Sequence, residues 1–165
     1  MHVTSGEVKT VGAPPYPAMT IAKWFVAWAQ AQPEELSNMK LQKLLYFAQG
    51  HYLARHHAPL FAEPMQAWSH GPVVPRVYRA YKHFGSSTVE LDDAADFSWD
   101  DVDPATSEFL SMVWNTYGGY SAGRLRNMTH EDGPWRTSWR GEDERDVPIS
   151  QDAMERYFGQ LETAG

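Results

Sequence analysis

The dominant pattern of this sequence is the helical spacing of its apolar residues, which recur every three or four positions in six separate stretches. These stretches are 20–32, 37–55, 72–84, 103–117, 121–129 and 150–161. Residues 134–139 add one further helical turn, whereas 65–70 and 147–149 are short and typical of strands. The pattern predicts a mainly α, single compact helical domain of about six helices with a small β-hairpin or short-strand element.

Residues at the ends of the stretches support these boundaries. Four of them are suited to cap a helix N-terminus: Thr20, Ser37, Asp103 and Ser150. Pro33, Gly85 and Gly118 stand where helices should stop. Gly50 lies inside the second helix at a cost of about 1 kcal/mol relative to Ala, so we expect a neighbouring backbone to approach it closely.

Length and composition limit the class of protein. A chain of 165 residues with 42% hydrophobic residues can bury one core. The absence of cysteine excludes a disulfide scaffold, a cysteine metal site and a thiol nucleophile, and it favours a cytoplasmic protein. No apolar run is long enough to span a membrane, and the start lacks the pattern of a signal peptide. Residues 1–18 are rich in Gly and Pro without a period, so we expect a flexible N-terminal tail followed by a folded domain over 19–162.

The net charge of −7 is unevenly distributed. Residues 86–123 contain no Lys or Arg but eight acidic side chains, among them Asp92, Asp93 and Asp96. Such a run is most often a solvated loop, and the alternative is a surface that attracts a basic protein. A chain this acidic is a poor general binder of nucleic acid.

Motifs of common enzymes and metal sites are absent from the sequence. The seven histidines show no H-E-x-x-H arrangement, and residues 118–123 have the glycine spacing of a P-loop but lack the lysine and hydroxyl that must follow. We therefore predict no catalytic, cofactor-binding or metal-binding residues, and no enzyme activity.

The functions of two histidines and of one basic stripe each have two interpretations. His70 follows Trp68 and precedes Gly-Pro, where its ring is better suited to fix a turn than to catalyse; His130 beside Trp135 has the same ambiguity. An enzyme would require His70 and His130 to converge in one cleft. A basic stripe of Arg76, Arg79 and Lys82 could track a phosphate backbone, although the net charge argues against nucleic-acid binding.

Several blocks of the sequence together resemble the Panacea domain of SocA-like antitoxins. The main block is MKLQKLLYFAQG at residues 39–50. It is followed in the family's order by PLF at 59–61, EP at 63–64, AW at 67–68, HGPV at 70–73 and VY at 77–78. Leu125 to His130, Pro134-Trp135 and a C-terminal helix after Val147-Pro148-Ile149 complete a match over about residues 19–160.

This resemblance implies an antitoxin of a bacterial or phage type II toxin–antitoxin system, some of which serve phage defence. Such a protein binds a toxin encoded by an adjacent gene and blocks its activity. Toxins paired with the domain include nucleotide-metabolising synthetases, translation inhibitors and membrane-acting peptides. Some relatives instead resemble proteolytic adaptors that deliver the toxin to an AAA+ protease. The short N-terminal segment does not match the zinc-ribbon or DNA-binding extension of other members, which weakens the case for transcriptional autoregulation but leaves the question open.

We expect the toxin to be bound sterically, with aromatic anchors supplying affinity and acidic residues supplying association speed. The candidate partner-binding residues adjoin the His-Gly-Pro turn or belong to the acidic run: Trp68, His70, Arg76, Tyr78, Arg79, Asp92, Asp93, Asp96, His130 and Trp135. The sequence gives no oligomeric state.

Overall fold

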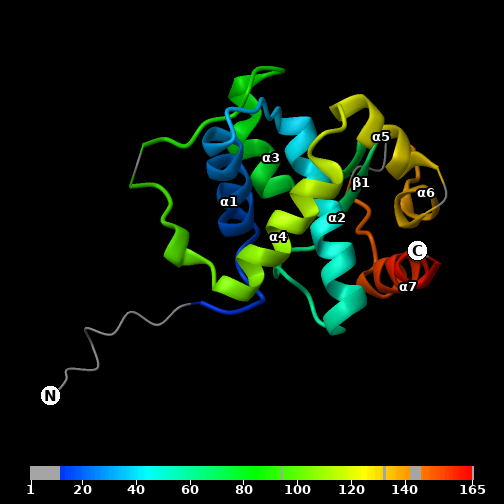
Figure 1. The fold of residues 1–165 in the computed structure, drawn as a ribbon. Coiled ribbons are helices and arrows are strands. Elements are labelled where there is room, and N and C mark those ends of the chain that lie inside the picture. Colours follow the sequence, from blue (N-terminus) through cyan, green and yellow to red (C-terminus); the bar gives the residue numbers. More distant parts are fainter. Residues whose placement is uncertain (1–11, 94, 132, 142–145, 165) are drawn as a thin grey trace, which may run out of the picture.

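The computed structural model describes residues 12–93, 95–131, 133–141 and 146–164. Within these residues there are seven α-helices and one two-stranded antiparallel sheet (Figure 1). The helices are α1 (Ala18–Ala31), α2 (Asn38–His56), α3 (Pro75–Tyr81), α4 (Pro104–Tyr117), α5 (Ala122–His130), α6 (Pro134–Ser138) and α7 (Gln151–Ala164). Short 3-10 turns η2 (Lys82–Phe84) and η3 (Trp99–Asp101) follow α3 and precede α4. The predicted mainly α fold with a small hairpin is confirmed.

Helix α2 is the centre of the domain. Residues 41–50 are all buried, which means that neighbours surround this part of the helix on every side. In Figure 1, α1 lies to one side of α2 and α7 to the other, and α3, α4 and α5 also contact it. Ser37 caps α2 by accepting a hydrogen bond from the Lys40 amide, as its sequence position predicts.

Gly50 allows α7 to pack closely against α2. A Cβ added at Gly50 would lie 2.1 Å from the ring of Phe158, which is fully buried. The close approach expected from the sequence is therefore present, but a side chain and not a backbone makes it. Tyr46 and Phe47 contact the same Phe158 ring edge-on, so aromatic packing fixes the α2–α7 contact.

Two buried glutamines of α2 hold the following chain segments in place. Gln49 donates to the Phe61 carbonyl at 3.1 Å and accepts from the Leu60 amide at 2.8 Å. Gln42 accepts from the Val74 amide at 2.9 Å and donates to Asn38 at 3.0 Å. Both side chains thereby pair with buried backbone groups of the segments that follow α2, which would otherwise lack a hydrogen-bond partner.

Strands β1 (Gln66–Trp68) and β2 (Gly71–Val73) form the hairpin, with Ser69 and His70 at its turn. Residues 147–149, expected as a brief strand, run beside β1. The Ala67 amide donates to the Val147 carbonyl, and the Ile149 amide donates to the Met65 carbonyl. This pairing brings the chain from α6 back to α7 past the hairpin.

The segment before α1 differs from the expected flexible tail. Residues 1–11 of that expected tail lie outside the described residues, but Tyr16 is only 4% exposed. Its backbone bonds to Leu60 and Ala62, and its hydroxyl donates to Asp103 at 2.6 Å. The folded part therefore begins several residues before Met19. Burial of the hydroxyl and its bond to Asp103 raise the pKa of Tyr16 to about 12.

Two predicted helix starts are wrong by a few residues. Helix α1 begins at Ala18 after Pro17, not after Thr20, because Pro17 supplies extended backbone angles that serve as the N-cap. Helix α3 begins at Pro75 because Pro72 belongs to β2. The predicted caps Asp103 of α4 and Ser150 of α7 are confirmed by bonds to the Thr106 and Ala153 amides. Across the described residues, none of these helices is long and apolar enough to cross a bilayer.

Candidate functional site

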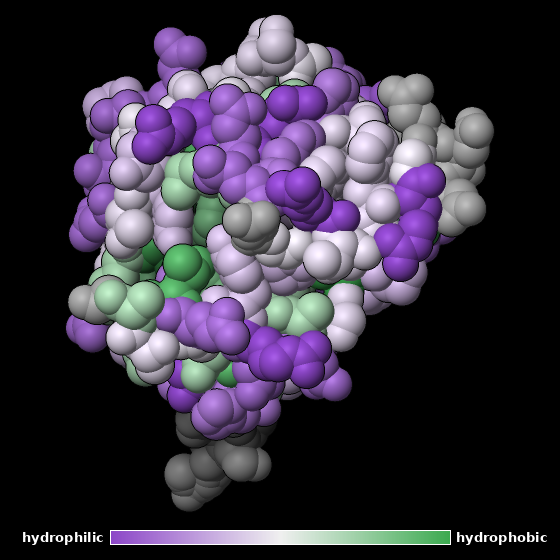
Figure 2. All heavy atoms as spheres, turned by 90° about the vertical axis from the view of Figure 1, so that its right-hand side faces the viewer, coloured by the Kyte–Doolittle hydropathy of each residue, from purple (hydrophilic) through white to green (hydrophobic). Residues whose placement is uncertain are grey.

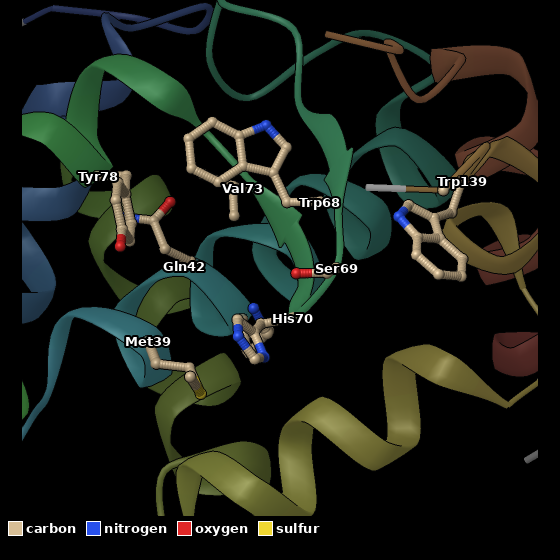
Figure 3. Close-up of a pocket in the computed structure, with 10 residues that line it drawn as sticks. Met39, Gln42, Trp68, Ser69, His70, Val73, Tyr78 and Trp139 are labelled. Carbon is tan, nitrogen blue, oxygen red and sulfur yellow. The ribbon is translucent and has the colours of Figure 1, made fainter. Parts of the chain in front are cut away.

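A cavity of about 340 Å³ lies between the start of α2, the β-hairpin and α3. Its lining combines aromatic and apolar surfaces with a few polar groups: Met39, Gln42, Lys43, Trp68, Ser69, His70, Val73, Tyr78, Trp139 and Gly141. In Figure 3, Trp68, Val73 and Tyr78 form one end, His70 and Met39 lie lower down, and Trp139 stands apart on the far side. The volume and mixed lining are typical of small-molecule sites.

Lys43 is the unusual residue of this cavity. Its side chain is 1% exposed, and among the described residues its Nζ has one acceptor in reach, the Pro72 carbonyl at 3.4 Å. That distance is longer than a strong charge-assisted hydrogen bond. Burial, helped by the nearby positive charge of Arg126, lowers the pKa of Lys43 from 10.5 to about 7. The amine is thus buried with little to compensate its charge.

Gly71 gives the lysine its space. A Cβ at Gly71 would lie 2.7 Å from Cε and 2.9 Å from Nζ of Lys43, and 3.1 Å from the hydroxyl oxygen of Thr129. Gly71 also has a φ of +118°, which other residues rarely adopt. The glycine of the His-Gly-Pro motif therefore serves both the turn and the close approach of the amine.

His130 ends α5 and is not among the residues that line the cavity. Its ring stacks on Trp135 with centroids 3.7 Å apart, and its buried Nε2 has no hydrogen-bond partner among the described residues. Burial and the charges of Arg126, Lys43 and His70 lower the pKa of His130 to about 4. Trp135 donates from its indole to the Trp68 carbonyl at 2.6 Å, which fixes the end of β1 to α6.

The two histidines do not form an acid–base pair. His70 is exposed at the turn, and no hydrogen bond joins its ring to His130 or to backbone in the described part of the chain. The expectation that the His70 ring bonds backbone groups at the turn is therefore not met. The convergence in one cleft that the enzyme alternative requires is also missing. A search of the described residues finds no cluster of three or more His, Asp or Glu that could hold a metal.

Of the remaining predicted residues, Tyr78 lines the cavity from α3 and the others lie outside it. Arg76 and Arg79 are exposed on α3, while Tyr78 packs edge-on against Trp68 at 5.2 Å. Asp92 and Asp93 are exposed on the segment between η2 and η3, and Asp96 pairs with Lys23 of α1 at 2.7 Å. Figure 1 shows this segment on the far side of α1 from β1, so the predicted set divides into two separate surfaces.

Sequence reasoning did not assign Lys43, Gln42, Thr129 or Arg126. Lys43 and Gln42 stand between Leu41 and Leu44 in the signature block, and a polar pair there is ordinarily read as the solvent side of a helix. The signal that could have found them is that apolar residues of 41–48 occur on every side of the helix, which leaves no solvent side for a lysine.

In the residues described, the domain is mainly helical, with a small cavity of mixed aromatic and polar lining that His130 does not line. A family described as antitoxin SocA-like, Panacea domain, matches residues 41–136. Antitoxin SocA of Caulobacter vibrioides (strain NA1000 / CB15N) is 32% identical over 127 residues, covering 72% of this chain and 68% of that protein. No solved structure matches the chain. The chain belongs to the SocA-like antitoxins with a Panacea domain, as its sequence resemblance indicates.

Proposed function

We propose that this protein neutralises a protein toxin by binding it directly. The observation that carries the proposal is membership of the SocA-like antitoxins, supported by a relative named antitoxin SocA. Proteins of such a family act on a toxin, and the toxin here is taken to be encoded by an adjacent gene. A steric mode of action agrees with the separation of His70 and His130, which do not share the cavity in the described part of the chain.

The acidic segment between η2 and α4 is the surface best suited to attract a basic toxin. Glu90, Asp92 and Asp100 are exposed there, and among the described residues no basic side chain pairs with them. Opposite charges on two surfaces raise the association rate even where they add little affinity. The segment therefore has the charge pattern of a docking surface for a basic protein.

An aromatic cluster next to these carboxylates offers an anchor. Trp99 is 47% exposed and stands edge-on to Trp24 and Trp28, whose rings stack at 4.8 Å. Within the described ranges, the buried Nε1 of Trp28 has no hydrogen-bond partner. An exposed tryptophan on a rigid aromatic base is a common centre of protein interfaces. By contrast, Figure 2 shows that the face carrying α6 and α7 is mostly hydrophilic, with small recessed apolar areas.

The acidic residues differ in what they can contribute. Asp96 binds Lys23 and accepts from the Asp92 amide, and Asp103 caps α4, so both support the fold. Asp101 closes the capping box of η3. Glu90, Asp92 and Asp100 are consequently better partner-binding candidates than Asp96.

A growth assay tests the proposed function. The gene beside this one is expressed from an inducible promoter, with and without this protein, and growth and co-purification are followed. We expect growth arrest by the neighbour, relief by this protein, and elution of the two together. Relief that coincides with loss of the toxin, and that disappears when a host AAA+ protease is deleted, would identify a proteolytic adaptor. Absence of toxicity or of relief would contradict the proposal.

A further inference from the structure

In the family-like block of α2, residues 39–50, Lys43 is a buried polar side chain without a strong hydrogen bond to the rest of the described fold. Gln42 and Gln49 satisfy backbone groups of later segments, and Gly50 admits Phe158. Lys43 in the same block is as deeply buried as these residues, but its amine has only the 3.4 Å contact with the Pro72 carbonyl among the described residues. A buried cation without strong partners lowers the stability of a domain, which suggests that it has another role.

Within the part of the chain that the structure describes, the charged neighbour of the amine is another cation. Arg126 of α5 raises the electrostatic cost of a charged Lys43, and no carboxylate of the described residues offsets it. An anion placed at the amine would therefore offset this repulsion.

The cavity that Lys43 helps to line has room for such an anion and for the organic group that carries it. Trp68 and Tyr78 form an aromatic wall, and Met39 and Val73 add apolar surface. Gln42 and Ser69 add polar groups to the lining. A pocket of about 340 Å³ accommodates a planar ring with one charged substituent.

We propose that this cavity binds a small organic oxyanion, a carboxylate or phosphate carried on a planar apolar body, with the oxyanion at the Lys43 amine. The cradle at Gly71, which admits the amine, is part of the site. The inference goes beyond neutralisation of a toxin, because it concerns a ligand of the isolated chain and can hold or fail independently of any partner.

Calorimetric titration of the purified chain at pH 7.5 tests the proposal. The probes are benzoate, phenyl phosphate, inorganic phosphate and benzyl alcohol, which separate the charged group from the ring. We expect benzoate or phenyl phosphate to bind at one site, inorganic phosphate at least tenfold more weakly, and benzyl alcohol not measurably. Titration in two buffers of different ionisation heat should show uptake of part of a proton, because the bound oxyanion favours the charged amine.

Three variants complete the test. Lys43→Met should weaken binding at least tenfold and abolish the proton uptake, whereas Lys82→Met, at an exposed lysine after α3, should leave both unchanged. Gly141, which lines the cavity, is followed in the sequence by Glu142, Asp143 and Glu144. The triple variant E142Q/D143N/E144Q tests whether one of these carboxylates, and not an added ligand, is the anion that binds Lys43. We expect the variant to bind benzoate as the unmodified chain does.

Several results would overturn the proposal. These are no saturable binding of benzoate or phenyl phosphate, equal binding by Lys43→Met, and binding of benzyl alcohol as tight as that of benzoate. Binding of benzoate by the triple variant alone would also overturn it, since the anion would then come from the chain. The proton uptake is measured on the unmodified protein, so the proposal remains falsifiable even if Lys43→Met does not fold.

Discussion

At the scale of single residues, the molecule keeps polar groups inside its core for different reasons. Gln42 and Gln49 are structural, because the amide oxygen and nitrogen of each are hydrogen-bonded within the fold. Lys43 and His130 are not saturated, and burial lowers the pKa of both. The two kinds of buried polar residue should therefore respond in opposite ways to substitution: loss of a saturated group destabilises, and loss of an unsatisfied one stabilises.

Lys43→Met should make the protein more stable, by roughly 1–4 kcal/mol near neutral pH. The pKa of Lys43 is about 7 in the folded chain and 10.5 when unfolded, so the unfolded chain binds more protons between these values. Stability of the unmodified protein should therefore rise as pH increases from 7, and this rise should be smaller in Lys43→Met. Urea unfolding at several pH values between 6.5 and 9 measures it, with exposed Lys82→Met as the control. Destabilisation by Lys43→Met would contradict this account of the buried amine.

His130→Phe should flatten the acid limb of the stability curve. The pKa of His130 falls from 6.5 to about 4 on folding, so the stability that depends on the neutral ring is complete above pH 6.5 and is lost as pH falls toward 4. Phenylalanine can keep the stack on Trp135 without taking up a proton. Thermal unfolding between pH 4 and 7 checks this, and His83→Phe at an exposed position should retain the unmodified slope. Identical curves for His130→Phe and the unmodified chain would show that His130 does not control the acid limb.

At the scale of elements, the sequence was sufficient where local chemistry decides structure. Ser37, Asp103, Ser121 and Ser150 lie before helices that the apolar spacing predicts, and each accepts a bond from the first turn. The sequence predicts a short strand over 65–70, and the structure pairs 66–68 with 71–73 around a turn at Ser69 and His70. Residues 72 and 73, which the apolar spacing assigns to a helix, therefore belong to the second strand.

Long-range contacts account for what the sequence did not show. Tyr16 is ordered by Leu60, Ala62 and Asp103, which are distant in the chain, and no local pattern reveals such partners. The cavity escaped prediction for the same reason: it needs α2, the hairpin, α3 and the segment after α6 together. Periodicity places Lys43 on a helix, but only the packing of several elements shows that the helix has no solvent side.

Gly50→Ala should loosen the contact between α2 and α7. The added Cβ would overlap the Phe158 ring, and overpacking of this kind costs about 2 kcal/mol, more than the helix propensity that alanine adds. Gly159→Ala on α7 is the matched control: a Cβ there meets nothing within 4 Å, so the free energy of unfolding should increase by about 0.5–1 kcal/mol. Denaturant unfolding measures both. A stabilising Gly50→Ala would contradict the packing described for α7.

At the scale of the whole molecule, two surfaces on different sides of the domain have different charge. The cavity beside the hairpin contains an unbalanced cation, and the segment beyond α1 contains exposed carboxylates around Trp99. Under the two proposals above, a toxin docks at the acidic segment while the cavity stays accessible to a small anion, so that the domain would bind two ligands of opposite charge.

Charge reversal of the exposed carboxylates should slow association with a basic toxin. We expect the triple variant E90K/D92K/D100K to lower the association rate about tenfold or more at low salt, with a smaller difference at high salt because ions screen the interaction. Stopped-flow or surface-based kinetics at two ionic strengths measures this. Asp152→Lys on α7, an exposed carboxylate that is not among the candidate partner-binding residues, serves as a control outside the acidic segment. Equal association rates at low salt would exclude the acidic segment as the steering surface.

The most direct test of the central claim is a titration of the purified toxin from the adjacent gene with this purified protein, with toxin activity as the readout and no protease present. Direct neutralisation predicts that activity falls in proportion to the added protein and reaches zero at a fixed molar ratio, with a stable complex on size-exclusion chromatography. Full toxin activity at a large excess of this protein would contradict the claim.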